Sequence, residues 1–162
     1  MITKATIKDI PLIQDLAQKS WRSHYPGIIS PEQIDFMLDL MYSEEEITRQ
    51  FNNPNYHYCL LGDAENFYGI MGFENHYEQN TTKLHRIYLT EDGKGKGLGK
   101  EAIQFLKNQI LEVGDQKRIL AVNKQNPTYH FYLSQGFKVY EEGVFDIGNG
   151  FVMDDYLMEW NA

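Results

Sequence analysis

The chain has 162 residues, with 23 acidic side chains against 15 lysines and arginines and a formal net charge of -8 at pH 7. This length predicts one domain, residues 1–162, and the acidic balance without a basic stripe argues against nucleic acid as a partner. The single cysteine excludes an internal disulfide framework. The lack of a signal-like or membrane-length apolar run predicts a cytoplasmic protein without membrane contact.

The first third of the chain predicts a short strand followed by helices. Residues 2–7 have strand character, and Asp9 is placed to cap a helix whose apolar side chains repeat at helical spacing as far as Pro26. Two further short helices should begin at Ser30 and Ser43, because each serine is followed three residues later by Gln or Glu, as in a capping box.

The middle of the chain predicts a meander of antiparallel strands. Residues 56–63, 66–77 and 83–89 are rich in aromatic and β-branched side chains and are separated by turn residues. Residues 98–113 then place apolar side chains on one helix face, and Gly114 is suited to end that helix.

The last part of the chain returns to strands. Residues 118–123 form a continuous apolar run of buried-strand type, and Asn126-Pro127 opens a short helix that Gly136 closes. Two final strands are expected on either side of the turn at residues 148–150. The chain therefore alternates helices and strands without an internal repeat.

Four glycines stand within seven residues between the predicted strand 83–89 and the predicted helix 98–113. Glycine adds unfolded-state entropy, so this concentration indicates a close approach to the backbone or unusual dihedral angles. The first amides of a helix have no intrahelical partner and attract anions. The segment, with three lysines beside the glycines Gly93, Gly95, Gly97 and Gly99, therefore predicts a phosphate site, with a merely flexible turn as the alternative.

Two common nucleotide-binding motifs do not explain this segment. A P-loop requires Ser or Thr after Gly-Lys, but Gly99-Lys100 is followed by Glu101. A dinucleotide fingerprint is formally met by residues 97–102, yet no acidic residue ends the predicted strand 118–123, where a ribose partner should stand.

The segment Lys94-Gly95-Lys96-Gly97-Leu98-Gly99 resembles motif A of the GNAT acyltransferases, Q/R-x-x-G-x-G/A, with Lys94 where the family usually has Gln or Arg. Residues 120–140, LAVNKQNPTYHFYLSQGFKVY, resemble the second motif of the same family, and the order of elements fits from end to end. Residues 21–38 and 145–158 resemble a PaiA-like subgroup of polyamine acetyltransferases.

The resemblance implies a fold and a reaction. The fold is α/β (α+β by order), with a mixed, mostly antiparallel central sheet of about seven strands flanked by about four helices. The sheet should be splayed between the strand before the glycine loop and the strand 118–123. The reaction is transfer of an acetyl group from acetyl-CoA, the cofactor, to a primary amine by direct attack.

The resemblance also implies roles for the residues around the cofactor. The backbone of the strand end pairs with the pantetheine arm, and the Leu89 amide faces the thioester oxygen as the oxyanion donor. The glycine loop holds the diphosphate, Asn126 bonds the pantetheine arm, and Tyr132 protonates the departing thiolate. The residues implied for coenzyme A are Ile87, Tyr88, Leu89, Lys94, Gly95, Lys96, Gly97, Leu98, Gly99, Lys100, Asn126 and Tyr132.

The acceptor amine requires a base, because a primary amine with a pKa near ~10.4 is almost entirely protonated at neutral pH. Glu74 and His85 are the candidates, since both lie on strands expected to flank the site. Strand alternation predicts that His85, Ile87 and Leu89 share one face of their strand.

The amine pocket is expected from the first helices and the last hairpin. Trp21 and Tyr25, one helical turn apart, provide an aromatic wall for an alkylammonium stem, and Asp154 and Asp155 provide negative charge. A buried aromatic pair and a solvated acidic pair are the structural alternatives. The histidines and Cys59 show no metal-ligand spacing, so no metal site is expected.

The acceptor is expected to be a small polyamine such as spermidine or spermine. Protein N-termini, protein lysines and amino-acid-like amines stay open, as does a non-catalytic coenzyme A-binding module. Tyr132 favours the enzyme, because a binding module needs no phenol beside the sulfur. A homodimer is a further possibility, with a second subunit completing a pocket lined by strand edges.

Overall fold

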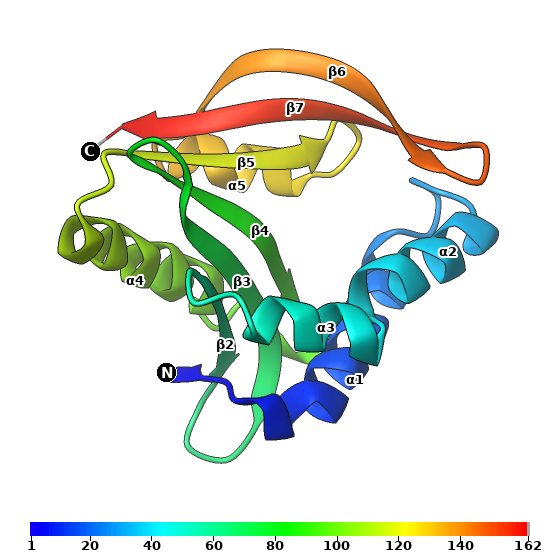
Figure 1. Cartoon of the computed structure of the whole chain (residues 1–162). Coiled ribbons are helices and arrows are strands. Elements are labelled where there is room, and N and C mark those ends of the chain that lie inside the picture. The colour runs from blue at the N-terminus through cyan, green and yellow to red at the C-terminus, as the bar shows by residue number, and fades with distance from the viewer. Residues whose placement is uncertain (162) are drawn as a thin grey trace.

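The structure of the chain is a computed structural model, and it describes residues 1–161. One sheet of seven strands runs through it, with helices against both faces (Figure 1). In chain order the elements are β1 (Ile2–Lys4), the 3-10 turn η1 (Ile7–Asp9), α1 (Ile10–His24), α2 (Pro31–Tyr42), α3 (Glu44–Phe51), β2 (Tyr56–Gly62), β3 (Phe67–Glu78), β4 (Thr81–Leu89), the 3-10 turn η2 (Glu91–Gly93), α4 (Leu98–Val113), β5 (Lys117–Asn123), α5 (Thr128–Ser134), β6 (Lys138–Gly148) and β7 (Phe151–Asn161).

The strands follow the order β1-β2-β3-β4-β5-β7-β6, and every neighbouring pair is antiparallel except β4 and β5. The parallel pair is joined at only three positions, from Thr81↔Lys117 to Lys83↔Ile119. Beyond Lys83 the two strands diverge, and β5, β7 and β6 cross above the first four strands in Figure 1. The predicted fold class, including the splay, is confirmed.

Two apolar clusters hold the helices on the sheet. One joins α1, α2 and α3 to one face of β2 and β3, through fully buried side chains such as Ile13, Trp21 and Ile47. The other joins α4 and α5 to the opposite face, through side chains such as Ile103 and Leu106. The helices therefore pack against both faces of the sheet, and no strand fills the gap where β4 and β5 diverge.

The predicted caps are largely confirmed. Ser30 Oγ accepts the Gln33 amide at 3.1 Å and Ser43 Oγ accepts the Glu46 amide at 3.2 Å, so α2 and α3 begin where expected. Asp9 stands at the N-cap position of α1, as predicted, but its carboxylate accepts the Thr6 amide at 2.8 Å. The Asp9 side chain thus closes the turn η1 and makes no capping hydrogen bond to α1.

A β-bulge on β4 changes the faces on which its side chains lie. Gly72 pairs with Arg86 and Phe73 pairs with Leu84, so His85 is the extra residue. The His85 ring stacks on Tyr56 at 5.1 Å, on the face covered by α1–α3, whereas Ile87 and Leu89 pack into the cluster of α4. The predicted alternation is therefore wrong for His85, because a bulge shifts the two-residue period by one.

Among residues 1–161 no helix is long and apolar enough to cross a membrane.

Candidate active site

A cavity of about 860 Å³ opens where β4 and β5 part. Its walls come from α1, α2, β4, the glycine loop, the start of α4, β5, α5 and the β6–β7 hairpin. Most of the predicted site residues line it: Trp21, Tyr25, His85, Ile87, Tyr88, Leu89, Lys94, Gly95, Gly97, Leu98, Gly99, Lys100, Asn126, Tyr132 and Asp155. Three do not: Glu74, Lys96 and Asp154.

The four glycines of the loop serve two different needs. Gly95 and Gly97 have φ of 77° and 75°, a left-handed conformation that other residues rarely adopt. Gly93 and Gly99 instead allow close approach, since a Cβ would stand 2.6 Å from Tyr68 Cβ and 3.3 Å from the Phe131 ring, respectively. A side chain would strain the backbone at Gly95 or Gly97, would displace Tyr68 at Gly93, and would press on the Phe131 ring at Gly99.

The loop leaves a set of backbone amides free at the start of α4. The first helical bond runs from the Glu101 amide to the Gly97 carbonyl. Within residues 1–161 the amides of Leu98, Gly99 and Lys100 have no backbone partner. These amides and the positive end of the helix dipole form a cradle that fits a diphosphate.

The lysines of the loop differ in their surroundings. Lys94 pairs with Glu91 at 3.0 Å and still lines the cavity. Lys96 lies over the Tyr68 ring at 5.1 Å, outside the cavity wall, so the prediction that it faces the cofactor is not supported by its position. Lys100 also lines the cavity, and its own amide is the last of the three free amides.

The edge of β4 presents backbone groups to the gap. The Thr90 amide donates to the Tyr68 carbonyl at 2.7 Å, on the β3 side. Because amides alternate along a strand, those of Ile87 and Leu89 point the other way, where β5 has already diverged. Tyr88, by the same alternation, turns its amide to β3 and only its ring to the cavity.

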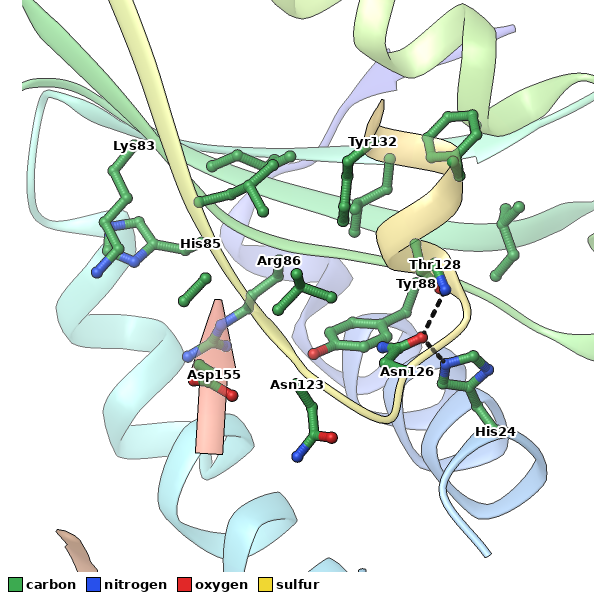
Figure 2. Close-up of a pocket in the computed structure, with 18 of the residues that line it drawn as sticks. His24, Lys83, His85, Arg86, Tyr88, Asn123, Asn126, Thr128, Tyr132 and Asp155 are labelled. Carbon is green, nitrogen blue, oxygen red and sulfur yellow. Dashed lines mark hydrogen bonds between the residues drawn. The ribbon is translucent and has the colours of Figure 1, made fainter. Parts of the chain in front are cut away.

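Two helices meet the cavity at Asn126. The Asn126 side-chain oxygen accepts the Thr128 amide at 2.9 Å and lies 2.8 Å from His24 Nε2, as Figure 2 shows. This contact joins the end of α1 to the start of α5. The sequence analysis missed His24, since no local pattern links two residues that lie 102 positions apart.

Tyr132 of α5 is buried and lines the cavity. Burial raises the pKa of its phenol, so the hydroxyl stays protonated across the physiological range. Among residues 1–161, burial and the neighbouring Tyr88 account for this raised pKa without a hydrogen bond to the hydroxyl. The proton is therefore available to a group that enters the cavity.

The predicted aromatic wall is both core and lining. Trp21 lies 4.4 Å from Tyr25 and 5.4 Å from Tyr88, measured between ring centroids. All three rings line the cavity, although Trp21 and Tyr25 are almost fully buried.

The two neighbouring aspartates of β7 point to opposite faces. Asp155 lines the cavity with 8% of its surface exposed, and its Oδ1 has no hydrogen-bond partner within residues 1–161. Burial, together with the neighbouring Asp154, raises the pKa of Asp155 to about 6. Asp154 lies outside the cavity and pairs with Lys124 at 3.0 Å, so the prediction that both carboxylates face the amine is wrong for Asp154.

The two predicted bases form a hydrogen-bonded pair. His85 Nε2 lies 3.0 Å from Glu74 Oε1, and only His85 lines the cavity. Burial and the nearby Lys83 lower the pKa of His85 to about 4, against the opposing effect of Glu74. The imidazole is therefore neutral at pH 7, and Glu74 reaches the cavity only through it.

Several further cavity residues were not predicted. Arg86 of β4 is a buried arginine next to the apolar end of that strand, Ile87–Leu89, a signal that the sequence analysis did not use. A second group is apolar and comes from α2 and the last hairpin, which are joined by the hydrogen bond from Gln33 Nε2 to the Val152 carbonyl at 2.9 Å. This group consists of Met37, Met41, Phe145, Ile147 and Met153.

No cluster of His, Cys, Asp and Glu in residues 1–161 could hold a metal ion.

Comparison with known families matches residues 28–156 to the acetyltransferase (GNAT) domain. The chain belongs to the GNAT acetyltransferase family. It is an acetyltransferase, and its acetyl donor is acetyl-coenzyme A, for which the free amides and positive-φ glycines of the loop form a suitable cradle.

Individual relatives of this GNAT acetyltransferase span nearly the whole chain. A spermidine N(1)-acetyltransferase of Thermoplasma acidophilum is 28% identical over 156 residues, 94% of each chain. The crystal structure of PaiA N-acetyltransferase from the same organism, in complex with coenzyme A, has a TM-score of 0.84 and 24% identity, over 100% of this chain and 98% of that one. An uncharacterised N-acetyltransferase of Lactobacillus delbrueckii subsp. lactis is 23% identical over 159 residues, 91% of this chain and 90% of the relative. The predicted resemblance to PaiA-like proteins is confirmed.

Proposed function

We propose that this acetyltransferase acts on a primary amine of a small polyamine such as spermidine or spermine, by direct attack. The observation that carries the proposal is Asp155, a buried carboxylate that lines the cavity with one oxygen unpaired. An ammonium group satisfies that oxygen, and the rings of Trp21, Tyr25 and Tyr88 suit the methylene stem beside it. The spermidine N(1)-acetyltransferase relative supports the same acceptor class.

Acetyl-coenzyme A supplies the acetyl group as an activated thioester. The free amides from Leu98 to Lys100 hold its diphosphate, and Lys94 and Lys100 add positive charge. Lys94 binds as a point charge rather than as the planar fork of an arginine.

The open backbone of β4 orients the reacting thioester. The Ile87 and Leu89 backbones face the gap left by β5, where an extended chain can pair with them. The Leu89 amide donates to the oxygen on which negative charge develops, a contribution of about 3 kcal/mol in comparable oxyanion sites. Asn126 completes the hold on the extended arm.

Tyr132 supplies a proton to the departing sulfur. Its hydroxyl is held protonated by burial, and within residues 1–161 no hydrogen bond contributes to its pKa shift. A thiolate with a pKa near ~8.5 leaves readily, so the phenol speeds departure without being indispensable.

Removing the proton of the amine is the larger demand. At pH 7.4 only about one part in a thousand of an amine with a pKa near ~10.4 is neutral. Asp155 accepts a hydrogen bond from the ammonium, and His85, backed by Glu74, is the neutral base that lines the same cavity. Protein N-termini and lysines remain the competing acceptors, and a homodimer stays a prediction.

Thiol release from acetyl-coenzyme A over a panel of amines tests the proposal. The panel contains spermidine, spermine, a peptide with a free N-terminus and a lysine peptide with both ends blocked. Release stimulated most by a polyamine is expected. Coenzyme A binding without release on any amine would instead favour a non-catalytic binding module, and release on the peptides alone would move the acceptor to proteins.

A further inference from the structure

Arg86 is a buried cation without an acidic partner. It lines the cavity from β4 with 6% of its surface exposed (Figure 2). One nitrogen, Nη1, donates to the Tyr58 hydroxyl at 2.6 Å, and the guanidinium lies over the Tyr42 ring at 4.4 Å. Within residues 1–161 no carboxylate lies within 4.0 Å of it.

The groups around Arg86 do not neutralise it. Burial raises the pKa of the phenols Tyr42, Tyr56, Tyr58 and Tyr88, so these hydroxyls stay uncharged. The neighbouring acids are engaged elsewhere, Glu46 with Arg49 and Glu74 with His85. A desolvated guanidinium in such surroundings is costly unless an anion pairs with it.

Asp155 presents the opposite charge to the same cavity. It comes from β7, lacks a partner for Oδ1, and makes no ion pair with Arg86. Among the buried side chains of the cavity wall, Arg86 is thus a cation and Asp155 an anion without an ion-pair partner in residues 1–161. The remaining Glu and Lys side chains of the same wall are more exposed: Glu78, Lys83, Lys94 and Lys100. A ligand that carries both an ammonium group and a carboxylate compensates both at once.

We propose that the cavity also accepts amines that carry a carboxylate, with the Arg86 guanidinium binding the carboxylate and Asp155 binding the ammonium group. This further activity rests on the proposed acetyl transfer. In it the amine nitrogen forms a bond to the acetyl carbon, the carbon–sulfur bond breaks, the amine loses a proton and the thiolate gains one. The products are the N-acetyl amino-carboxylate and free coenzyme A.

The chemistry of arginine suits this role. A planar guanidinium binds a carboxylate through two parallel N–H···O bonds, and only one of its nitrogens is used by Tyr58. The same charge repels the second ammonium of a diamine. Arg86 therefore shifts preference toward an amine of the same length that carries a carboxylate.

Lysine and cadaverine test the inference, because they share one carbon chain and differ by a carboxylate; ornithine and putrescine form a second such pair. Thiol release gives kcat/KM for lysine, lysinamide and cadaverine. We expect lysine to exceed both others by about 10-fold or more, the size of a charge-assisted pair in a desolvated site. Arg86→Gln should bring the ratio of lysine to cadaverine close to one, and Arg86→Lys should restore part of it.

Arg118→Gln is the matched control. Arg118 is likewise fully buried, stacks on an aromatic ring (Trp160, at 3.1 Å), and has no hydrogen-bond partner in residues 1–161, but it lies outside the cavity. This variant should leave the ratio of lysine to cadaverine unchanged. A fall in that ratio in Arg118→Gln equal to that in Arg86→Gln overturns the inference.

Calorimetry on the unaltered protein decides the matter if Arg86→Gln does not fold. Lysine should bind about 10-fold more tightly than lysinamide in the presence of coenzyme A. Equal affinities, or equal kcat/KM for lysine and cadaverine, overturn the inference while leaving amine acetylation intact. If the enzyme acetylates none of these amines and does not acetylate spermidine, the inference and the proposed function are both overturned.

Discussion

The two halves of the cavity are built in different ways. The half proposed to bind the cofactor (the cofactor half) uses the backbone of one continuous segment, from Ile87 to Lys100. The half proposed to bind the amine (the acceptor half) uses side chains from distant segments, such as Trp21 on α1 and Asp155 on β7. A backbone site depends on where glycines allow the chain to go, whereas a side-chain site depends on which elements the fold brings together. Mutations that change the backbone path should weaken cofactor binding in the first half. Mutations that remove a charge should weaken amine binding in the second half.

The largest effect should come from adding a side chain to the loop. Gly97→Val places a branched side chain at a positive φ inside the cavity wall, so coenzyme A affinity should fall at least ~100-fold, from the loss of two or more charge-assisted hydrogen bonds. Calorimetric titration with coenzyme A measures this loss.

Gly114→Val is the control for strain at the other end of α4. Gly114 also has a positive φ, 79°, with open space around it, and lies outside the cavity. Both variants should lose on the order of 2 kcal/mol of unfolding free energy, but only Gly97→Val should lose affinity. Equal affinities in the two variants would contradict the position of the diphosphate.

The second effect concerns the proton donor. Tyr132→Phe removes the hydroxyl and keeps the ring, so kcat should fall about 100-fold while coenzyme A affinity stays within a few-fold. Steady-state kinetics and calorimetry separate the two quantities. Tyr129→Phe, on the same helix but outside the cavity, should change neither. A Tyr132→Phe enzyme with full kcat would assign the proton transfer to water.

The third effect concerns the charge of Asp155 in the acceptor half. Asp155→Asn should lower kcat/KM for spermidine about 10-fold at pH 8, because the ammonium loses a charged partner. The difference should vanish below about pH 5, since the carboxyl of the native protein, with its pKa raised to about 6, is then protonated as well. Rates measured from pH 5 to pH 9 check this. Asp154→Asn, at the neighbouring position outside the cavity, should keep the native rate at pH 8 and move the midpoint of the profile to lower pH, because Asp154 contributes to the raised pKa of Asp155.

The same aspartate should lower stability as pH rises. The pKa of Asp155 is about 6 in the folded protein and about 3.9 when unfolded. The folded state therefore holds more protons between these values, and stability falls with pH across that window. Asp155→Asn should be more stable than the native protein by about 1 to 3 kcal/mol above pH 7 and equal to it near pH 4. Urea denaturation at the two pH values tests the sign.

The smallest effect should come from the paired bases. His85→Gln and Glu74→Gln should each lower kcat only a few-fold, and the double variant should lose no more than the larger single change, because Glu74 acts through His85. Additive losses in this cycle would mean that the two groups act separately. The pH profile above pH 5 should not depend on His85, since burial lowers its pKa to about 4.

The sequence predicts the strand, the glycine loop and the helix of the cofactor half because their determinants are local. Strand, glycines and helix follow one another, and the order itself sets the amides of Leu98 and Gly99 at the helix start. The caps at Ser30 and Ser43 were predicted for the same reason. The capping hydrogen bond predicted for Asp9 does not form, because the Asp9 carboxylate instead accepts the amide of Thr6, three residues earlier, in a competing turn.

The acceptor half is less predictable because it depends on register. Which of two neighbouring aspartates faces the cavity follows from the pairing of β7 with β5. The bulge at His85 follows from β3 packing against β4, which the sequence of β4 alone does not encode. The contact of His24 with Asn126 joins residues that only the folded chain brings together.

The three-residue pairing of β4 with β5 has a consequence for the lifetime of the protein in a cell. The unpaired stretch beyond Lys83 is an internal sheet edge, and under the proposed function the pantetheine arm pairs with it as a missing strand would. A ligand that binds only the folded state stabilises it. At a ligand concentration one hundred times the dissociation constant, the free energy of unfolding rises by about 2.7 kcal/mol. Depletion of coenzyme A should therefore expose the chain to proteolysis, and abundance of the enzyme should follow supply of its donor.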